Sequence, residues 1–249
     1  MFSRPRSAAT LMILRNGVNG GGQSPEVLML LRHPGNKFVP LNYVYPGGAV
    51  DEEDTAGDII DRCRGIVPLE AMNIIPEAKT PEYAMGFWIA AIRETFEETG
   101  ILYAVNSNGD PVTLSGPEEK ERFSRYRREI HEKKLSLYSM LEREGLFPDA
   151  GRIFFFSRWI TPPFSSIRYD AHFFVAGFPE GQDVRHDGKE LTEHVWISPA
   201  EALAKYRQGN FRMVLPTVET IREAGRYQTI EDAISGLSQS KYRNVCHSG

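Results

Sequence analysis

Three glutamates in one short stretch, Glu94, Glu97 and Glu98, have the spacing at which side chains share one face of a helix. Like charges at this spacing repel each other, so the helix needs a compensating positive charge. Arg93 lies four residues before Glu97 and can neutralise part of the cluster. The remaining negative charge suits a hard divalent cation with oxygen ligands, Mg²⁺ or Mn²⁺. A solvated acidic helix face is the alternative for three such glutamates taken alone.

Two further features favour the metal site. The opposite face of the same predicted helix carries small or apolar residues such as Phe87 and Ala91, so this helix is expected to pack against a core. Upstream, Gly47 and Gly48 follow Pro46. Consecutive glycines let the backbone approach another group closely, so this turn can place a carbonyl oxygen beside a metal ion.

Together the two segments resemble the Nudix box, whose pattern is Gly-x5-Glu-x7-Arg-Glu-U-x-Glu-Glu-x-Gly-U, where U is an aliphatic residue. The matching positions are Arg93, Glu94, Glu97, Glu98, Gly100 and Ile101, with Gly48 as the first glycine. Thr95 stands where the pattern has an aliphatic residue, and Asp54 stands where it has glutamate. In the pattern this glutamate pairs with the arginine. Aspartate is one methylene shorter, so the contact of Asp54 with Arg93 is left open. The spacer between the halves, residues 55–92, has 38 residues instead of seven.

This interrupted box is similar to the Nudix branch that contains the eukaryotic acyl-coenzyme A diphosphatases, which carry a long insert at the same place. The segments that carry the resemblance are residues 30–32, 38–40, 44–51, 93–101, 159–162 and 168–174. The resemblance covers about residues 8–205. It implies an α/β (α+β) fold, the Nudix α/β/α sandwich with a mixed central sheet, here with helical insertions.

The resemblance also implies roles for the site residues. Glu94, Glu97 and Glu98 are expected to bind the metal, with the Gly48 carbonyl as a further ligand, and Arg93 is expected to orient the carboxylates. Water would attack one phosphorus of a pyrophosphate linkage, a reaction catalysed mainly by positioning and charge neutralisation. The general base is left open. The candidates are Glu97, Glu94, and the later-loop residues Glu190, Glu193 and His186.

Residues for substrate binding are less well marked. The candidates that could hold phosphate groups or stack on adenine are Arg32, Lys37, Phe38 and Arg168, followed by Tyr169 and His172. A surface or packing role is the alternative for each. The favoured substrate is coenzyme A or acyl-coenzyme A. ADP-ribose, NADH or a nucleotide sugar is the alternative, and a non-catalytic nucleotide sensor or a helical interaction protein is a different class of function.

The elements that must position these residues follow from hydrophobic periodicity. Strands are predicted at 8–15, 27–32, 43–45, 101–106, 152–160, 171–178 and 194–197, with a glycine-rich hairpin loop at 17–24. Helices are predicted at 81–99, 199–207, 215–225 and 229–238. Residues 51–80 are expected to hold one short helix. Residues 117–143 are expected to form one long helix or a helical pair, which could be a lid or a homodimer surface.

The bulk properties fit one domain of 249 residues, with insertions at about 55–80 and 115–145 and a helical extension from about 210. A net charge of −4 gives no reason to expect nucleic acid or an anionic membrane as partner, so a small nucleotide-derived substrate is preferred. The two cysteines, Cys63 and Cys246, form neither a disulfide framework nor a zinc pattern. Free thiols and no membrane-length apolar run favour a cytoplasmic protein.

Overall fold

The computed structural model describes residues 4–17, 24–36, 38–185 and 191–239. Within these ranges the chain divides into two compact units. Unit 1 comprises residues 1–46, 154–178 and 186–249, and unit 2 comprises residues 47–153 and 179–185. The prediction of a single domain with insertions concerns the chain as a whole and stays a prediction.

Unit 1 is built on a mixed sheet. Its strands are β1 (Arg6–Asn16), β2 (Pro25–Arg32), β3 (Tyr43–Val44), β7 (Phe154–Ile160), β8 (Tyr169–Gly177) and β9 (Leu191–Ile197). The order is β3-β2-β1-β8-β7, and β9 pairs with β2. The β1–β8 pair is parallel, with Arg6 opposite Tyr169 and Leu14 opposite Gly177, whereas the other pairs in this unit are antiparallel. The predicted mixed sheet is therefore present.

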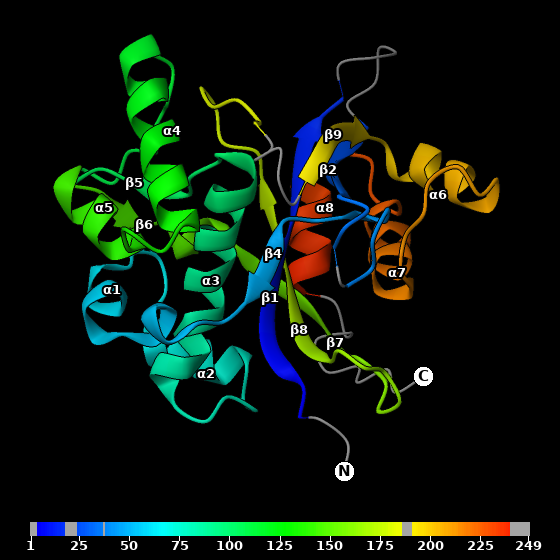
Figure 1. The fold of residues 1–249 in the computed structure, drawn as a ribbon, viewed down its shortest axis with the longest axis horizontal. Coiled ribbons are helices and arrows are strands. Elements are labelled where there is room, and N and C mark those ends of the chain that lie inside the picture. The colour runs from blue at the N-terminus through cyan, green and yellow to red at the C-terminus, as the bar shows by residue number, and fades with distance from the viewer. Residues whose placement is uncertain (1–3, 18–23, 37, 186–190, 240–249) are drawn as a thin grey trace. The chain divides into compact units, whose positions relative to one another are not determined.

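Three helices belong to the same unit: α6 (Pro199–Arg207), α7 (Leu215–Ala224) and α8 (Ile230–Ser238). Helix α8 packs against β7, β8 and β1, as Figure 1 shows. The side chains of Met12, Phe156, Val175, Ile221 and Leu237 meet in one hydrophobic core. The apolar alternation of the strands and the apolar stripes of α7 and α8 thus bury each other.

Unit 2 contains two longer helices and a set of short elements (Figure 1). The elements are β4 (Gly47–Ala49), η1 (Glu52–Thr55), α1 (Gly57–Arg62), α2 (Pro68–Ile74), α3 (Pro81–Thr99), β5 (Ala104–Val105), α4 (Pro117–His131), α5 (Leu137–Arg143), β6 (Phe147–Pro148) and η2 (Ala150–Arg152). Helices α1, α2 and α4, together with η1 and β4, pack directly on α3.

Helix α3 begins and ends where the sequence predicts. The Thr80 hydroxyl accepts a hydrogen bond from the Tyr83 N–H at 3.1 Å, and Pro81 occupies the first turn, where no intrahelical N–H is needed. Gly100 ends the helix at φ 76°, a left-handed conformation that glycine adopts without strain. The prediction of a helix at 81–99 is confirmed.

Two local predictions differ from the structure. Residues 51–80 contain η1, α1 and α2 instead of one short helix, because Pro68 starts a second α-helix. The predicted strand 101–106 is reduced to Ala104–Val105. Both backbone polar groups of Leu102 bond to the Gln182 side chain at 2.9 Å, and this pairing replaces a strand ladder.

Residues 117–143 form a helical pair, which was one of the two predicted alternatives. Helix α4 ends at His131 and α5 begins after Ser136, whose hydroxyl accepts a hydrogen bond from the Ser139 N–H. Between them Lys133 has φ 56°, a left-handed conformation that non-glycine residues adopt at a cost. The apolar residues of this pair are buried, as with Phe123 and Ile130, so they act in packing.

Cys63 gives a simple test of packing in unit 2. The residue is 8% exposed, and burial raises the pKa of its thiol to about 12. Because the thiolate is the reactive form, we expect Cys63 in the folded protein at pH 8 to react with a disulfide reagent at least about a hundredfold more slowly than free cysteine. A Cys246→Ser variant isolates this thiol, and its labelling rate before and after unfolding measures the effect. Fast labelling of the folded variant contradicts the packing described.

No helix among the described residues is long and apolar enough to cross a membrane.

Candidate active site

The three glutamates lie on the last two turns of α3 and share one face, as their spacing predicts. This face is largely covered, since Glu97 and Glu98 are each 7% exposed. Ionised carboxylates are rarely buried without compensation, so the neighbouring groups decide what this cluster can do.

Arg93 is the centre of the network that compensates these charges. Its Nη1 donates hydrogen bonds to Glu94 Oε1 at 2.8 Å and to Glu97 Oε1 at 2.9 Å. Its Nη2 donates to the Ala49 carbonyl at 2.9 Å. Arg93 is 1% exposed and its guanidinium has a fixed planar geometry, so it sets the positions of both carboxylates.

Asp54 completes this network despite its shorter side chain. Its two carboxylate oxygens accept hydrogen bonds from Arg93 Nε and Nη2, both at 2.8 Å. The short helix η1 carries Asp54 close enough, and the Asp51 N–H also donates to Asp54 Oδ2 at 2.8 Å. The contact that the sequence left open is formed. Burial raises the pKa of Asp54, and the bidentate pair with Arg93 opposes this shift.

The glycine turn lies directly against the glutamates. The Gly47 N–H donates a hydrogen bond to Glu98 Oε2 at 2.9 Å. A Cβ atom at Gly48 would lie 2.4 Å from the Glu94 carboxylate, a distance that real contacts do not reach. A residue with a side chain therefore cannot replace Gly48 without displacing Glu94, which explains the glycine at this position.

Glu94 shows that the cluster carries excess negative charge. Burial, together with the charge of Glu97, raises the pKa of Glu94 to about 7, although Arg93 acts in the opposite direction. One guanidinium is shared among Asp54, Glu94 and Glu97, so it cannot neutralise all three. An additional cation would be stabilised here.

The carboxylates are not arranged as a ready metal site. In the described part of the chain, no three His, Cys, Asp or Glu side chains form a group that could hold a metal ion as it stands. Arg93 lies between Glu94 and Glu97, and one oxygen of Glu98 faces the Gly47 N–H. The donor chemistry nevertheless fits a hard cation, because the face is rich in carboxylate oxygens. Binding would need side-chain rotation of the glutamates.

Helix α4 and the turn after it supply basic groups to this site. Arg127 donates from Nε to the Glu97 carbonyl at 2.7 Å and from Nη2 to the Glu98 carbonyl at 2.6 Å. His131 Nδ1 lies 3.7 Å from Glu97 Oε2, and Lys133 Nζ donates to Asp51 Oδ2 at 2.9 Å. Sequence reasoning missed these residues. They lie some 30 to 80 positions from their partners, so no local pattern marks them.

Comparison with known proteins identifies the family. Residues 6–223 match the NUDT19 Nudix domain. The chain belongs to this Nudix family. The prediction drawn from the interrupted box, membership of the acyl-coenzyme A diphosphatase branch, is thereby confirmed. The insertion between the box halves corresponds to α1, α2 and the first turns of α3.

The curated relatives of this Nudix chain include acyl-coenzyme A diphosphatases named NUDT19. The Xenopus laevis protein is 29% identical over an alignment of 208 positions, and the alignment covers 73% of this chain and 55% of that protein. The human protein is 24% identical over 83% of this chain and 62% of its own length. The chain thus spans little more than half the length of these relatives.

A solved structure confirms the predicted fold. A Nudix hydrolase from Alicyclobacillus acidocaldarius superimposes with a TM-score of 0.74 at 25% identity. The alignment covers 96% of this chain and 100% of that structure. The mixed α/β Nudix fold expected from the sequence is therefore present.

The remaining candidates for substrate binding and for the general base lie in unit 1 or outside the described residues. Those outside the described residues are Lys37, Glu190 and His186. Arg32 ends β2, and its Nε is buried without a hydrogen-bond partner in the described part of the chain. The Phe38 ring lies edge-on to Tyr169 with centroids 5.1 Å apart.

The other candidates in unit 1 are Arg168, His172 and Glu193. Arg168 Nε donates to the Thr161 carbonyl at 3.1 Å. His172 is 1% exposed within β8, beside the Phe155 ring, which indicates a packing role. Glu193 lies in β9 opposite Leu31 and is exposed.

Proposed function

We propose that the chain is a Mg²⁺- or Mn²⁺-dependent pyrophosphohydrolase that cleaves the pyrophosphate linkage of coenzyme A or an acyl-coenzyme A. One observation carries the proposal: three carboxylates on one face of α3, oriented by the buried Arg93–Asp54 pair, in a chain of the NUDT19 Nudix family. An interaction module has no need for such a network, whose charges are costly to bury.

In this proposal Glu94, Glu97 and Glu98 hold the divalent cation, and the Gly48 carbonyl is available as a further oxygen ligand. The cation would neutralise negative charge on the pyrophosphate oxygens and make a nearby water more acidic. Arg93 keeps Glu94 and Glu97 directed toward the same face through its shared Nη1. Arg127 fixes the backbone carbonyls of Glu97 and Glu98, so the end of α3 cannot fray.

The chemical step is attack of a water oxygen on one phosphorus and cleavage of its bond to the bridging oxygen. The water proton passes to a carboxylate, and the leaving phosphate keeps the bridging oxygen. Glu97 and Glu94 remain the candidates for this base in unit 2, with Glu190 as the candidate from the later loop. For substrate contacts we retain Arg32, Phe38 and Arg168 as proposals. An unpaired buried guanidinium nitrogen suits a phosphate oxygen, and the Phe38 ring suits an adenine.

Substrate hydrolysis tests the proposal directly. With Mg²⁺ or Mn²⁺ at alkaline pH, we expect cleavage of coenzyme A and acetyl-coenzyme A to 3′,5′-ADP and the corresponding phosphopantetheine, and loss of activity in EDTA. ADP-ribose, NADH and diadenosine polyphosphates complete the panel, with products separated by chromatography.

The panel also distinguishes the competing functions. Strong cleavage of ADP-ribose without cleavage of coenzyme A would support a hydrolase but reject coenzyme A as its substrate. If no compound is cut while a nucleotide raises the melting temperature, a non-catalytic sensor replaces the enzyme.

A further inference from the structure

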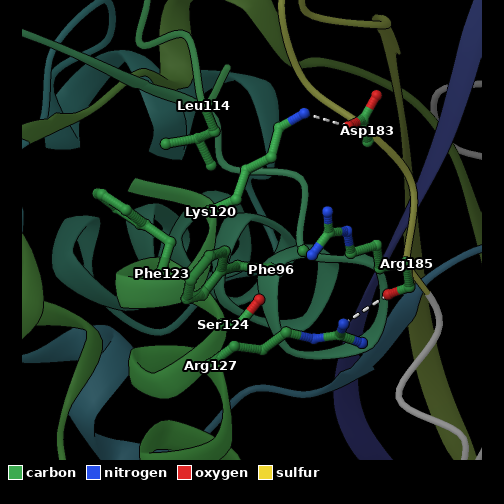
Figure 2. Close-up of a pocket in the computed structure, with 9 residues that line it drawn as sticks. Phe96, Leu114, Lys120, Phe123, Ser124, Arg127, Asp183 and Arg185 are labelled. Carbon is green, nitrogen blue, oxygen red and sulfur yellow. Dashed lines mark hydrogen bonds and ion pairs between the residues drawn. The ribbon is translucent and has the colours of Figure 1, made fainter. Parts of the chain in front are cut away.

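A small pocket lies beside the C-terminal end of α3 in unit 2 (Figure 2). Its apolar wall includes Phe96 of α3 and Phe123 of α4. Its charged groups are Lys120 and Arg127 of α4, and Asp183 and Arg185 of the segment that ends unit 2. Three cations and one anion therefore surround one cavity, in a chain whose net charge is −4.

The pocket is separate from the face that carries the box glutamates. An α-helix turns by about 100° per residue, so Phe96 points away from Glu94 and Glu98. Phe96 is 1% exposed and packs edge-on against Phe123, with ring centroids 6.4 Å apart. A ligand in the pocket would thus contact the far side of α3 and the N-terminal half of α4.

Arg127 removes the main electrostatic obstacle to an anion at this place. The C-terminus of a helix carries partial negative charge on its free carbonyl groups, which repels anions. Arg127 donates hydrogen bonds to the carbonyls of Glu97, Glu98 and Arg185. These bonds satisfy the helix end and leave the full positive charge of the guanidinium beside the pocket.

Arg185 is the group best placed to bind a ligand. Its backbone is fixed, because its N–H donates to the Thr99 carbonyl at 2.8 Å and its carbonyl accepts from Arg127 Nη1 at 2.5 Å. Its exposed guanidinium makes no hydrogen bond or ion pair with any other residue that the structure describes. Figure 2 shows this guanidinium directed into the pocket, between the side chains of Lys120 and Arg127.

Asp183 is the negative group with which an anionic ligand would have to compete for Lys120. Lys120 Nζ donates to Asp183 Oδ2 at 2.6 Å, and this bond lowers the pKa of the aspartate. Asp183 is exposed and Lys120 is partly exposed, so the pair contributes little to stability. Lys120 can therefore turn from Asp183 to a ligand at small cost.

We propose that this pocket binds a phosphate group through Arg185 and Lys120, as an anion site separate from the box carboxylates. Arginine is suited to phosphate because its planar fork donates two parallel hydrogen bonds, and lysine adds a point charge. The phosphate could be free orthophosphate or the monoester group of a nucleotide. The site does not depend on the proposed hydrolysis.

Binding of orthophosphate, measured by calorimetry at constant ionic strength, tests the proposal. EDTA is present throughout, so that phosphate cannot bind through a metal ion at the carboxylates. We expect saturable binding that Arg185→Gln weakens at least about tenfold, because the variant loses the charge and the paired hydrogen bonds of the guanidinium. Lys120→Gln should weaken it less. Arg128→Gln, which changes an exposed arginine outside the pocket lining, should leave it unchanged.

Asp183→Asn provides a test in the opposite direction. This variant removes the anion and frees Lys120, so phosphate should bind at least about threefold more tightly. A residue with a merely structural role would not produce tighter binding. Because Arg185 and Asp183 are exposed, each variant is expected to fold, which thermal unfolding confirms independently.

Parallel titrations with AMP and adenosine distinguish the two sources of phosphate. Tighter binding of AMP than of orthophosphate, lost in Arg185→Gln, identifies a nucleotide monoester. Equal affinities identify free phosphate. Absence of saturable binding by either anion, equal binding of adenosine and AMP, or an unchanged Kd in Arg185→Gln would overturn the proposal.

Discussion

Replacing Glu97 by glutamine is expected to lower kcat for pyrophosphate hydrolysis by at least about a hundredfold, with the melting temperature changed by less than about 5 °C. The amide oxygen of glutamine can still accept the hydrogen bond from Arg93 Nη1, so the packing around α3 is kept. The lost charge, in contrast, removes a proposed metal ligand and a candidate base. Initial rates at saturating Mg²⁺, together with thermal unfolding, measure the two effects.

Glu82→Gln is the matched control for this variant. Glu82 lies in the first turn of the same helix and is exposed, so its replacement should change neither kcat nor the melting temperature appreciably. A Glu97→Gln protein that keeps wild-type activity would remove Glu97 from the site. Equal losses of activity and of folded protein would instead assign Glu97 a structural role.

Replacing Asp54 by alanine is expected to destabilise the protein by about 3–5 kcal/mol, because it leaves the Arg93 guanidinium buried without its bidentate partner. Arg93 is 1% exposed and Asp54 is 1% exposed, so water cannot replace the lost carboxylate. At roughly 2–4 °C per kcal/mol for a chain of this size, the melting temperature should fall by about 10 °C. Activity should fall as well, since Arg93 positions Glu94 and Glu97.

A double-mutant cycle isolates the contribution of the pair itself. Asp54→Ala and Arg93→Met should each be strongly destabilising, whereas the double variant should cost clearly less than their sum, because neither charge is then left alone. Asp61→Ala, at an exposed position of α1, is the control and should change stability by less than about 0.5 kcal/mol. Additive effects of Asp54→Ala and Arg93→Met would contradict the coupling seen in the structure.

The contact of Asp54 with Arg93 depends on both the sequence and the tertiary structure. The sequence shows that aspartate replaces the glutamate of the box pattern, and one missing methylene leaves its contact with Arg93 open. The reach of a side chain depends on where the backbone lies, and here η1 carries Asp54 to 2.8 Å from Arg93. The tertiary structure therefore makes the contact possible. The large loss of stability expected for Asp54→Ala follows from this contact.

The box helix is the part that the sequence by itself determined. Thr80, Pro81 and Gly100 are local signals, and the glutamate spacing follows from helix geometry, so the bounds of α3 and its acidic face needed no tertiary information. The same holds for α6 and for the parts of β1 and β8 that bury apolar residues. In each case the signal lies within one element, where periodicity and capping act.

The contacts between elements far apart in the sequence were decided by the tertiary structure. The reduction of β5 depends on Gln182, some 80 residues away, which bonds to the backbone of Leu102. The support of the box by Arg127 and Lys133 likewise joins segments 30 and 82 residues apart. In the pocket beside α3, Lys120 likewise bonds to Asp183, which lies 63 positions later in the chain. Local patterns carry no information on such contacts, because side chains on separate segments meet only when the whole chain packs.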